Sequence, residues 1–115
     1  MGWIGVDLDG TLAFYDKWQG PMHIGGPIKP MVDRVKKWLD AGRDVRIFTA
    51  RVCGSDNLGV EAVRFAIRYW CYTNLGEELP ITNVKDWEMD ELWDDRCVQV
   101  LKNTGEPVGT STRGL

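Results

Sequence analysis

The chain alternates short apolar runs with amphipathic stretches. The apolar run that opens at Trp3 predicts a buried strand ending at Asp7. Pro30 suits the first turn of a helix, and residues 41–42, Ala-Gly, suit its end. The apolar face of this helix is formed by Val32, Val35, Trp38 and Leu39. Residues 44–49 are rich in strand formers. Strand, helix and strand in this order predict a right-handed βαβ unit with parallel strands.

The second half of the chain continues this pattern with weaker signals. Residues 51–57 predict a polar turn, and the apolar spacing after it predicts a second helix that runs to about Asn74. Residues 81–82 predict a short strand, and residues 97–101 predict a last strand. From residue 103 onward, glycine, proline and serine predict a loose tail. We therefore expect a single α/β domain over residues 1–115.

Residues 13–29, hereafter the flap, form a long segment rich in glycine and proline between the first strand and the first helix. Loops of this length are usually functional. Tyr15 and Trp18 fit two roles equally well, as walls of a pocket or as packing on the core. For the lone His23, a cap or solvent-facing position is favoured over a direct chemical role.

Composition narrows the classes of function. The chain has 115 residues, 43% of them hydrophobic, and a net charge of −3, which argues against nonspecific binding to nucleic acid. We expect no membrane association and no signal peptide. Three cysteines without C-x-x-C spacing and a single histidine favour neither disulfides nor a zinc site. A cytoplasmic location fits these features best.

Asp7 and Asp9 are the first candidates for chemistry. On an extended backbone, side chains two residues apart point the same way, so both carboxylates can reach one site. A solvated turn is one interpretation, since Asp-Gly is common in turns. An EF-hand loop is excluded, because Leu12 stands where that loop needs glycine and Trp18 where it needs glutamate. The third interpretation, a catalytic or metal-binding pair, needs partners elsewhere.

Such partners follow other predicted strands. Thr49 and Arg51 follow the second strand, Lys85 lies after the second helix, and Asp94-Asp95 follows Leu92-Trp93. Ligands bind at the carboxyl ends of strands in open parallel sheets, so these side chains can meet at one rim. Carboxylates suit Mg²⁺, and hydroxyl and cationic groups suit phosphoryl oxygens. Arg51 fits two roles equally, as a phosphate clamp or as the partner of an acid such as Asp56. The set predicts phosphoryl transfer with Mg²⁺ as cofactor.

These residues also carry a resemblance to a known family. The sequence Asp-x-Asp-Gly-Thr at 7–11, Thr49, Lys85 and Asp94-Asp95 resemble the four motifs of the haloacid dehalogenase (HAD) superfamily, in the same order. Residues 48–51 and 92–96 resemble small HAD-like hydrolases of phages and prophages. The Thr-x-Arg step also resembles the phosphatase domain of polynucleotide kinase-phosphatases. The resemblance implies a three-layer Rossmann-like fold with a mostly parallel sheet.

The resemblance implies a role for each residue of the first motif. Asp7 would be the nucleophile that forms an aspartyl phosphate, and it would also bind Mg²⁺. Asp9 would be the general acid and then the general base, and its backbone carbonyl would complete the metal shell. Gly10 would permit the turn that carries Asp9, and Thr11 would brace it.

The other motifs imply the phosphate and metal contacts. Thr49 and Lys85 would hold the phosphoryl group, with Arg51 as a further candidate. Asp94 would bind the metal directly, and Asp95 would bind through water or orient its neighbour. The acidic residues 90–91 interrupt the apolar stretch that usually precedes this motif, so we expect a short last core strand beginning near residue 91 or 92.

The spacing of the motifs leaves no room for a cap domain. A capless site resembles those that act on large substrates or rely on a homo-oligomer partner for closure, and the flap would be its lid. The sequence thus predicts a Mg²⁺-dependent phosphomonoesterase acting on a nucleotide, a sugar phosphate or a nucleic-acid 3′-phosphate end. The alternatives are a catalytically silent phosphate- or metal-binding module and a phosphotransferase.

Overall fold

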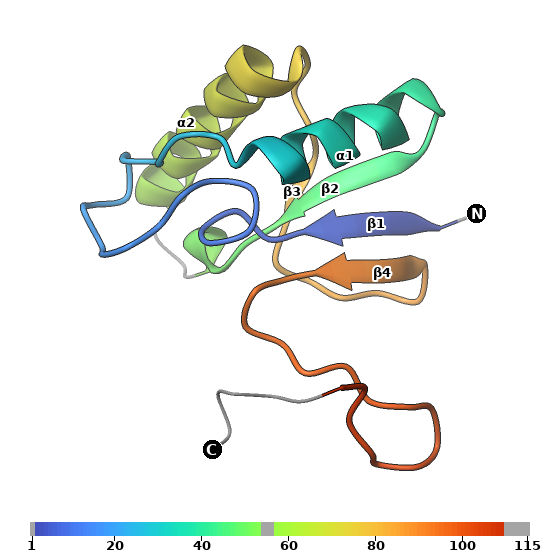
Figure 1. The fold of residues 1–115 in the computed structure, drawn as a ribbon. Helices are drawn as coiled ribbons and strands as arrows, with labels where there is room; N and C mark the ends of the chain where they lie inside the picture. The colour runs from blue at the N-terminus through green and yellow to red at the C-terminus, as the bar shows by residue number, and fades with distance from the viewer. Residues whose placement is uncertain (1, 54–56, 110–115) are drawn as a thin grey trace.

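A four-stranded parallel sheet organises the protein. The computed structural model describes residues 2–53 and 57–109. Its strands, in chain order, are β1 (Trp3–Val6), β2 (Asp44–Phe48), β3 (Ile81–Thr82) and β4 (Met89–Trp93). They lie in the order β3-β2-β1-β4, and every pairing is parallel (Figure 1). The expected α/β class with a parallel sheet is confirmed.

The helices form close to where the apolar pattern predicts them. Helix α1 (Lys29–Asp40) has proline in its first turn and ends where Gly42 adopts a φ of +79°, which favours glycine. Helix α2 (Asn57–Leu75) is followed by Gly76 in the same left-handed region. A short 3-10 helix, η1 (Ala50–Val52), follows β2 directly. None of the helices in the described ranges is long and apolar enough to cross a membrane.

The two long helices cover the same face of the sheet. The connections from β1 to β2 and from β2 to β3 step in the same direction, so right-handed crossovers bring α1 and α2 to one side, where they contact each other (Figure 1). The link from β3 to β4 is too short for a helix. Within residues 2–53 and 57–109, both long helices therefore cover one face of the sheet.

The main core lies between this sheet face and the helices. It is built from alternate residues of the central strands, including Ile4, Val6, Val45 and Ile47, all nearly inaccessible to solvent. Trp3 points to the other face, where the guanidinium of Arg46 covers its ring at 4.7 Å. Its indole nitrogen also donates a hydrogen bond of 2.8 Å to Asp86. On this second face, Trp3 is therefore covered by the side chains of Arg46 and Asp86.

The prediction of a last strand at residues 97–101 is wrong. This segment instead turns back on residues 106–108, with the Leu101 amide donating to the Glu106 carbonyl at 2.8 Å and the Val108 amide to the Gln99 carbonyl at 2.7 Å. The last strand of the sheet is β4, which starts two residues before the expected position 91. Acidic residues are tolerated in β4 because it lies at the sheet edge, where their side chains reach solvent. The end of the expected loose tail, residues 110–115, lies outside the described residues.

Candidate functional site

The parallel pairing of β1 and β4 brings carboxylates from opposite ends of the chain together. Asp7 follows β1, Asp94 and Asp95 follow β4, and the Asp7 amide donates a 2.8 Å hydrogen bond to the Trp93 carbonyl. One carboxylate oxygen from each of the three aspartates lies within 4.8 Å of the other two. We call Asp7, Asp94 and Asp95 the carboxylate cluster. This separation is short enough for one cation to contact all three groups.

The turn after β1 is shaped around this cluster. The Thr11 hydroxyl lies 3.3 Å from Asp7 Oδ2 and 3.2 Å from Asp95 Oδ1, and it accepts a 3.0 Å hydrogen bond from the Asp95 amide. Gly10 has a φ of +90°, and a Cβ added there would lie 2.7 Å from Asp95 Oδ2. Gly10 therefore permits the turn and also the close approach of Asp95, a second requirement that the sequence did not reveal.

The pKa of Asp7 is shifted by its surroundings in the carboxylate cluster. Burial is the main cause that raises the pKa of Asp7 to about 8, and the negative charges of Asp94 and Asp95 add to it. The hydrogen bond from Thr11 acts in the opposite direction but is the weaker effect. Without a cation, Asp7 therefore holds a proton near neutral pH.

A cavity of about 790 Å³ joins the carboxylate cluster to the end of β2 and to the flap. Asp7, Thr49 and Arg96 line it together with Tyr15 and Trp18 of the flap. Thr49 is almost fully buried, and its Oγ1 accepts a 3.1 Å hydrogen bond from the Arg51 amide at the start of η1. Its hydroxyl proton remains available for a ligand oxygen.

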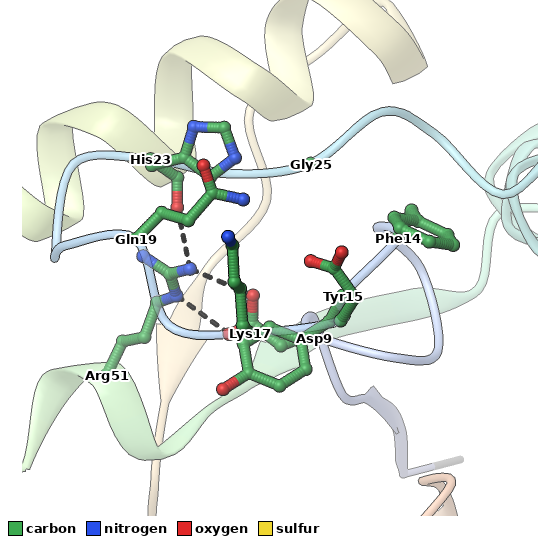
Figure 2. Close-up of a pocket in the computed structure, with 9 residues that line it drawn as sticks. Asp9, Phe14, Tyr15, Lys17, Gln19, His23, Gly25 and Arg51 are labelled. Carbon is green, nitrogen blue, oxygen red and sulfur yellow. Dashed lines mark hydrogen bonds and ion pairs between the residues drawn. The ribbon is translucent and has the colours of Figure 1, made fainter.

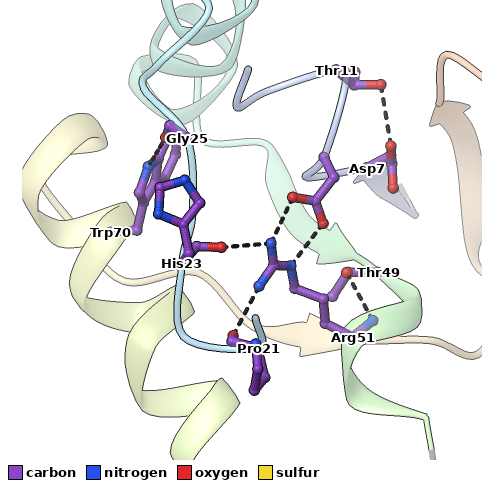
Figure 3. Close-up of polar contacts among 9 residues, drawn as sticks. Asp7, Thr11, Pro21, His23, Gly25, Thr49, Arg51 and Trp70 are labelled. Atoms are coloured by element: carbon purple, nitrogen blue, oxygen red, sulfur yellow. Dashed lines mark hydrogen bonds and ion pairs between the residues drawn. The ribbon is translucent and has the colours of Figure 1, made fainter. Parts of the chain in front are cut away.

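Arg51 pairs with Asp9, which was not among the partners that the sequence suggested. Its Nε lies 2.7 Å from Asp9 Oδ2, and its Nη2 lies 2.9 Å from Asp9 Oδ1. Nη1 donates to the Pro21 carbonyl at 2.8 Å, and Nη2 donates to the His23 carbonyl at 2.7 Å (Figure 3). The guanidinium thus uses four of its five N–H donors within the protein. Of the two expected roles, the structure has the ion pair; Asp56 lies outside the described residues.

The Arg51–Asp9 pair gives the two aspartates of the first motif, Asp7 and Asp9, different partners. Both side-chain oxygens of Asp9 accept from Arg51, and its carboxylate is not part of the cluster formed by Asp7. Both side chains line the cavity of about 790 Å³, but of the two only Asp7 belongs to the carboxylate cluster. A metal contact through the Asp9 backbone carbonyl stays a prediction.

The two other basic side chains near the site, Lys85 and Arg96, lie in different cavities. Lys85 lies in the exposed β3–β4 connection and lines a second cavity, of about 700 Å³, which Asp94 also lines. The structure does not bring it into the cavity of Asp7 and Thr49. Arg96 lines that cavity, and it belongs to no ion pair within the described residues. Its position directly after the last aspartate motif is the signal that could have marked it as a site residue.

The flap is fastened along its length. The Trp70 indole of α2 donates a 2.8 Å hydrogen bond to the Gly25 carbonyl (Figure 3). The Phe14 amide donates one of 2.8 Å to the Gly26 carbonyl. Tyr15, Lys17 and His23 line a smaller cavity of about 130 Å³ between the flap and Arg51 (Figure 2). His23 reaches Arg51 through its backbone carbonyl, with its ring in the wall of this small cavity.

Comparison with known proteins gives a likeness of fold. No protein-family model matches the chain. No curated protein matches it either. Among solved structures, it is similar to a conserved protein from Bacteroides thetaiotaomicron, with 22% sequence identity and a TM-score of 0.59. The match covers 84% of this chain and 78% of that one. At this identity the likeness supports the α/β fold alone.

Proposed function

We propose that this protein is a Mg²⁺-dependent phosphomonoesterase of the HAD type, with Asp7 as the nucleophile. The observation that carries the proposal is the convergence of three carboxylate oxygens within 4.8 Å, in a cavity that Thr49 also lines. Crowded carboxylates are costly without a cation, and a buried hydroxyl beside them suits a phosphoryl oxygen. The motif order described above supports the same reaction.

The residues present fit Mg²⁺. The carboxylate cluster offers only hard oxygen ligands. Burial raises the pKa of Asp7 most, and the neighbouring carboxylates add a like-charge repulsion that a cation would relieve. Asp7, Asp94 and Asp95 would hold the ion. When bound, Mg²⁺ supplies positive charge that lowers the cost of bringing an anionic nucleophile to a phosphate.

The proposed reaction has two steps. Asp7 attacks phosphorus, a P–O bond forms, and the ester P–O bond breaks while the leaving alcohol takes a proton from a general acid. Water then attacks phosphorus, which releases inorganic phosphate and restores the Asp7 carboxylate. The Thr49 hydroxyl donates a hydrogen bond to a phosphoryl oxygen. Arg96 also lines the cavity, and it has no ion-pair partner in the described part of the chain.

Asp9 is proposed as the general acid and base, which requires a change at Arg51. Both Asp9 oxygens accept hydrogen bonds from the guanidinium, so the carboxylate cannot hold a proton for the leaving group until one of these bonds opens. Substrate phosphate competing for Arg51 would free Asp9. The ion pair therefore holds Asp9 inactive before substrate enters.

The test is hydrolysis of an aryl phosphate by the wild type and by Asp7→Asn, each with Mg²⁺ and with EDTA. We expect turnover only in the wild type with Mg²⁺. Activity that survives the substitution, or that ignores EDTA, contradicts the mechanism. Asp33→Asn, which removes an exposed carboxylate on α1, is the matched control and keeps full activity.

The Arg51–Asp9 pair also favours a second candidate, a phosphate- or metal-binding module without turnover. If the pair never opens, the proposed acid stays unavailable while the carboxylate cluster still binds a cation. Mg²⁺ binding by calorimetry, with no hydrolysis across a panel of phosphomonoesters, would support this candidate over the enzyme.

A further inference from the structure

We propose that Tyr15 and Trp18 form a stacking subsite for a planar aromatic ring in the leaving group of the substrate. This inference rests on the proposed function and deepens it. It selects phosphomonoesters such as nucleotides over those of aliphatic alcohols such as sugars and glycerol. Three features of the flap support this subsite.

The first feature is the exposure of large aromatic side chains on a fastened loop. Trp18 is 57% exposed and Tyr15 is 44% exposed, although each could bury a large apolar surface. The flap is held on both sides of these rings, because the Phe14 amide donates to the Gly26 carbonyl and Arg51 donates to the carbonyls of residues 21 and 23. Both rings are therefore held at the surface, where their exposed apolar area is available to a ligand.

The second feature is how Trp18 is positioned. The Arg51 guanidinium lies 5.0 Å from the centre of its ring, and Arg51 itself is fixed by the bidentate pair with Asp9. One side of the indole thus lies against a buried guanidinium. With more than half of the side chain exposed, the ring keeps a free surface on which a planar group can stack.

The third feature is the charge around these rings. Arg51 is neutralised by Asp9, and Asp16 and Lys17, which line the small cavity beside Tyr15, carry opposite charges (Figure 2). The flap therefore offers no net positive charge for a second phosphate group. A neutral ring held by stacking fits this surface better than a further anion does.

The two rings also lie in reach of the proposed chemistry. Tyr15 and Trp18 line the same cavity of about 790 Å³ as Asp7 and Thr49, and Tyr15 lines the small cavity as well. A phosphate at the carboxylate cluster and a ring at the flap can therefore occupy one continuous space. The alternative is that Trp18 only shields the Arg51–Asp9 pair from water.

The experiment compares adenosine 5′-monophosphate with glycerol 3-phosphate as substrates, through the ratio of their kcat/KM values. In Trp18→Ala we expect this ratio to fall about tenfold, within the roughly 5- to 150-fold range of stacking on one aromatic side chain. The loss should appear in KM for the nucleotide, and Trp18→Phe should recover most of it. If Trp18 is only a shield, both substrates lose activity equally and the ratio stays the same, which overturns the proposal.

Trp87→Ala is the matched control. Trp87 is fully exposed and precedes the start of β4, whereas the cluster residues follow the end of that strand, so its loss should leave the ratio as in the wild type. If the wild type hydrolyses neither substrate, the proposed function fails and the subsite is tested by equilibrium dialysis of adenosine 5′-monophosphate. About tenfold weaker binding by Trp18→Ala then supports the subsite. Equal binding by both proteins, or no binding by the wild type at millimolar nucleotide, overturns it.

Discussion

Binding of Mg²⁺ should depend steeply on pH between 7 and 9, because Asp7 must lose a proton to become a ligand. Its pKa of about 8 leaves roughly one molecule in ten ionised at pH 7 and about nine in ten at pH 9. The affinity for Mg²⁺ should therefore rise about tenfold over this range. A carboxylate of ordinary pKa is already ionised at pH 7, so it would give no such increase.

Isothermal titration calorimetry in two buffers of different ionisation enthalpy measures both the affinity and the protons released. We expect about 0.9 proton per Mg²⁺ at pH 7 and about 0.1 at pH 9. Asp94→Asn removes a like charge that raises the pKa of Asp7, so the pH dependence should flatten while the affinity falls. Asp33→Asn, remote from the site, should behave as the wild type. Affinities equal within twofold at pH 7 and 9, with no proton release, would refute the reasoning.

The same shift has a consequence for stability without metal. The folded-state pKa of Asp7 lies above its ordinary value of 3.8, so the folded state binds this proton more tightly than the unfolded state does. The free energy of unfolding should therefore fall as the pH rises from about 4 to about 8 in EDTA. Saturating Mg²⁺ should remove most of this decrease, as thermal melts at several pH values can measure.

Three further substitutions test the surroundings of the site. Gly10→Ala should lower the free energy of unfolding by about 1–3 kcal/mol more than Gly42→Ala in urea titrations, because both have positive φ but only Gly10 also contacts a cluster carboxylate. Arg51→Lys should cost about 2–4 kcal/mol in the same assay, since lysine cannot reproduce the two-point contact with Asp9; a loss below 0.5 kcal/mol would show that the pair is weak. Trp70→Phe, which removes a hydrogen bond to the flap, should increase proteolytic cleavage within residues 13–29, and an unchanged cleavage rate would contradict the fastening of the flap.

Local patterns in the sequence were sufficient to predict the first strand and the first helix. The apolar run at Trp3 and the helical spacing of Val32 and Val35 depend on neighbours within a few residues, and both elements formed where they were expected. The proximity of Asp7 and Asp94 could also be predicted from the sequence, because parallel strands bring their carboxyl ends to one edge of the sheet.

The features that were missed depend on how distant segments meet. Arg51 and Asp9 are 42 residues apart, and Arg51 also donates to two carbonyls of the flap, an arrangement that no periodicity encodes. The segment at residues 97–101 has strand composition, but the sheet ends at β4 and provides no partner for it.

The central position of β1 has a consequence for the order of folding. Its partners are β2, about 40 residues later, and β4, more than 80 residues later. During synthesis, β1, α1 and β2 can associate early, whereas the edge of β1 that pairs with β4 stays open until the last strand emerges. Closing so long a loop is slow and costs much entropy, so the β1–β4 pairing should form late. A cation held by Asp7, Asp94 and Asp95 would then lock the first and last strands together as the final event of folding.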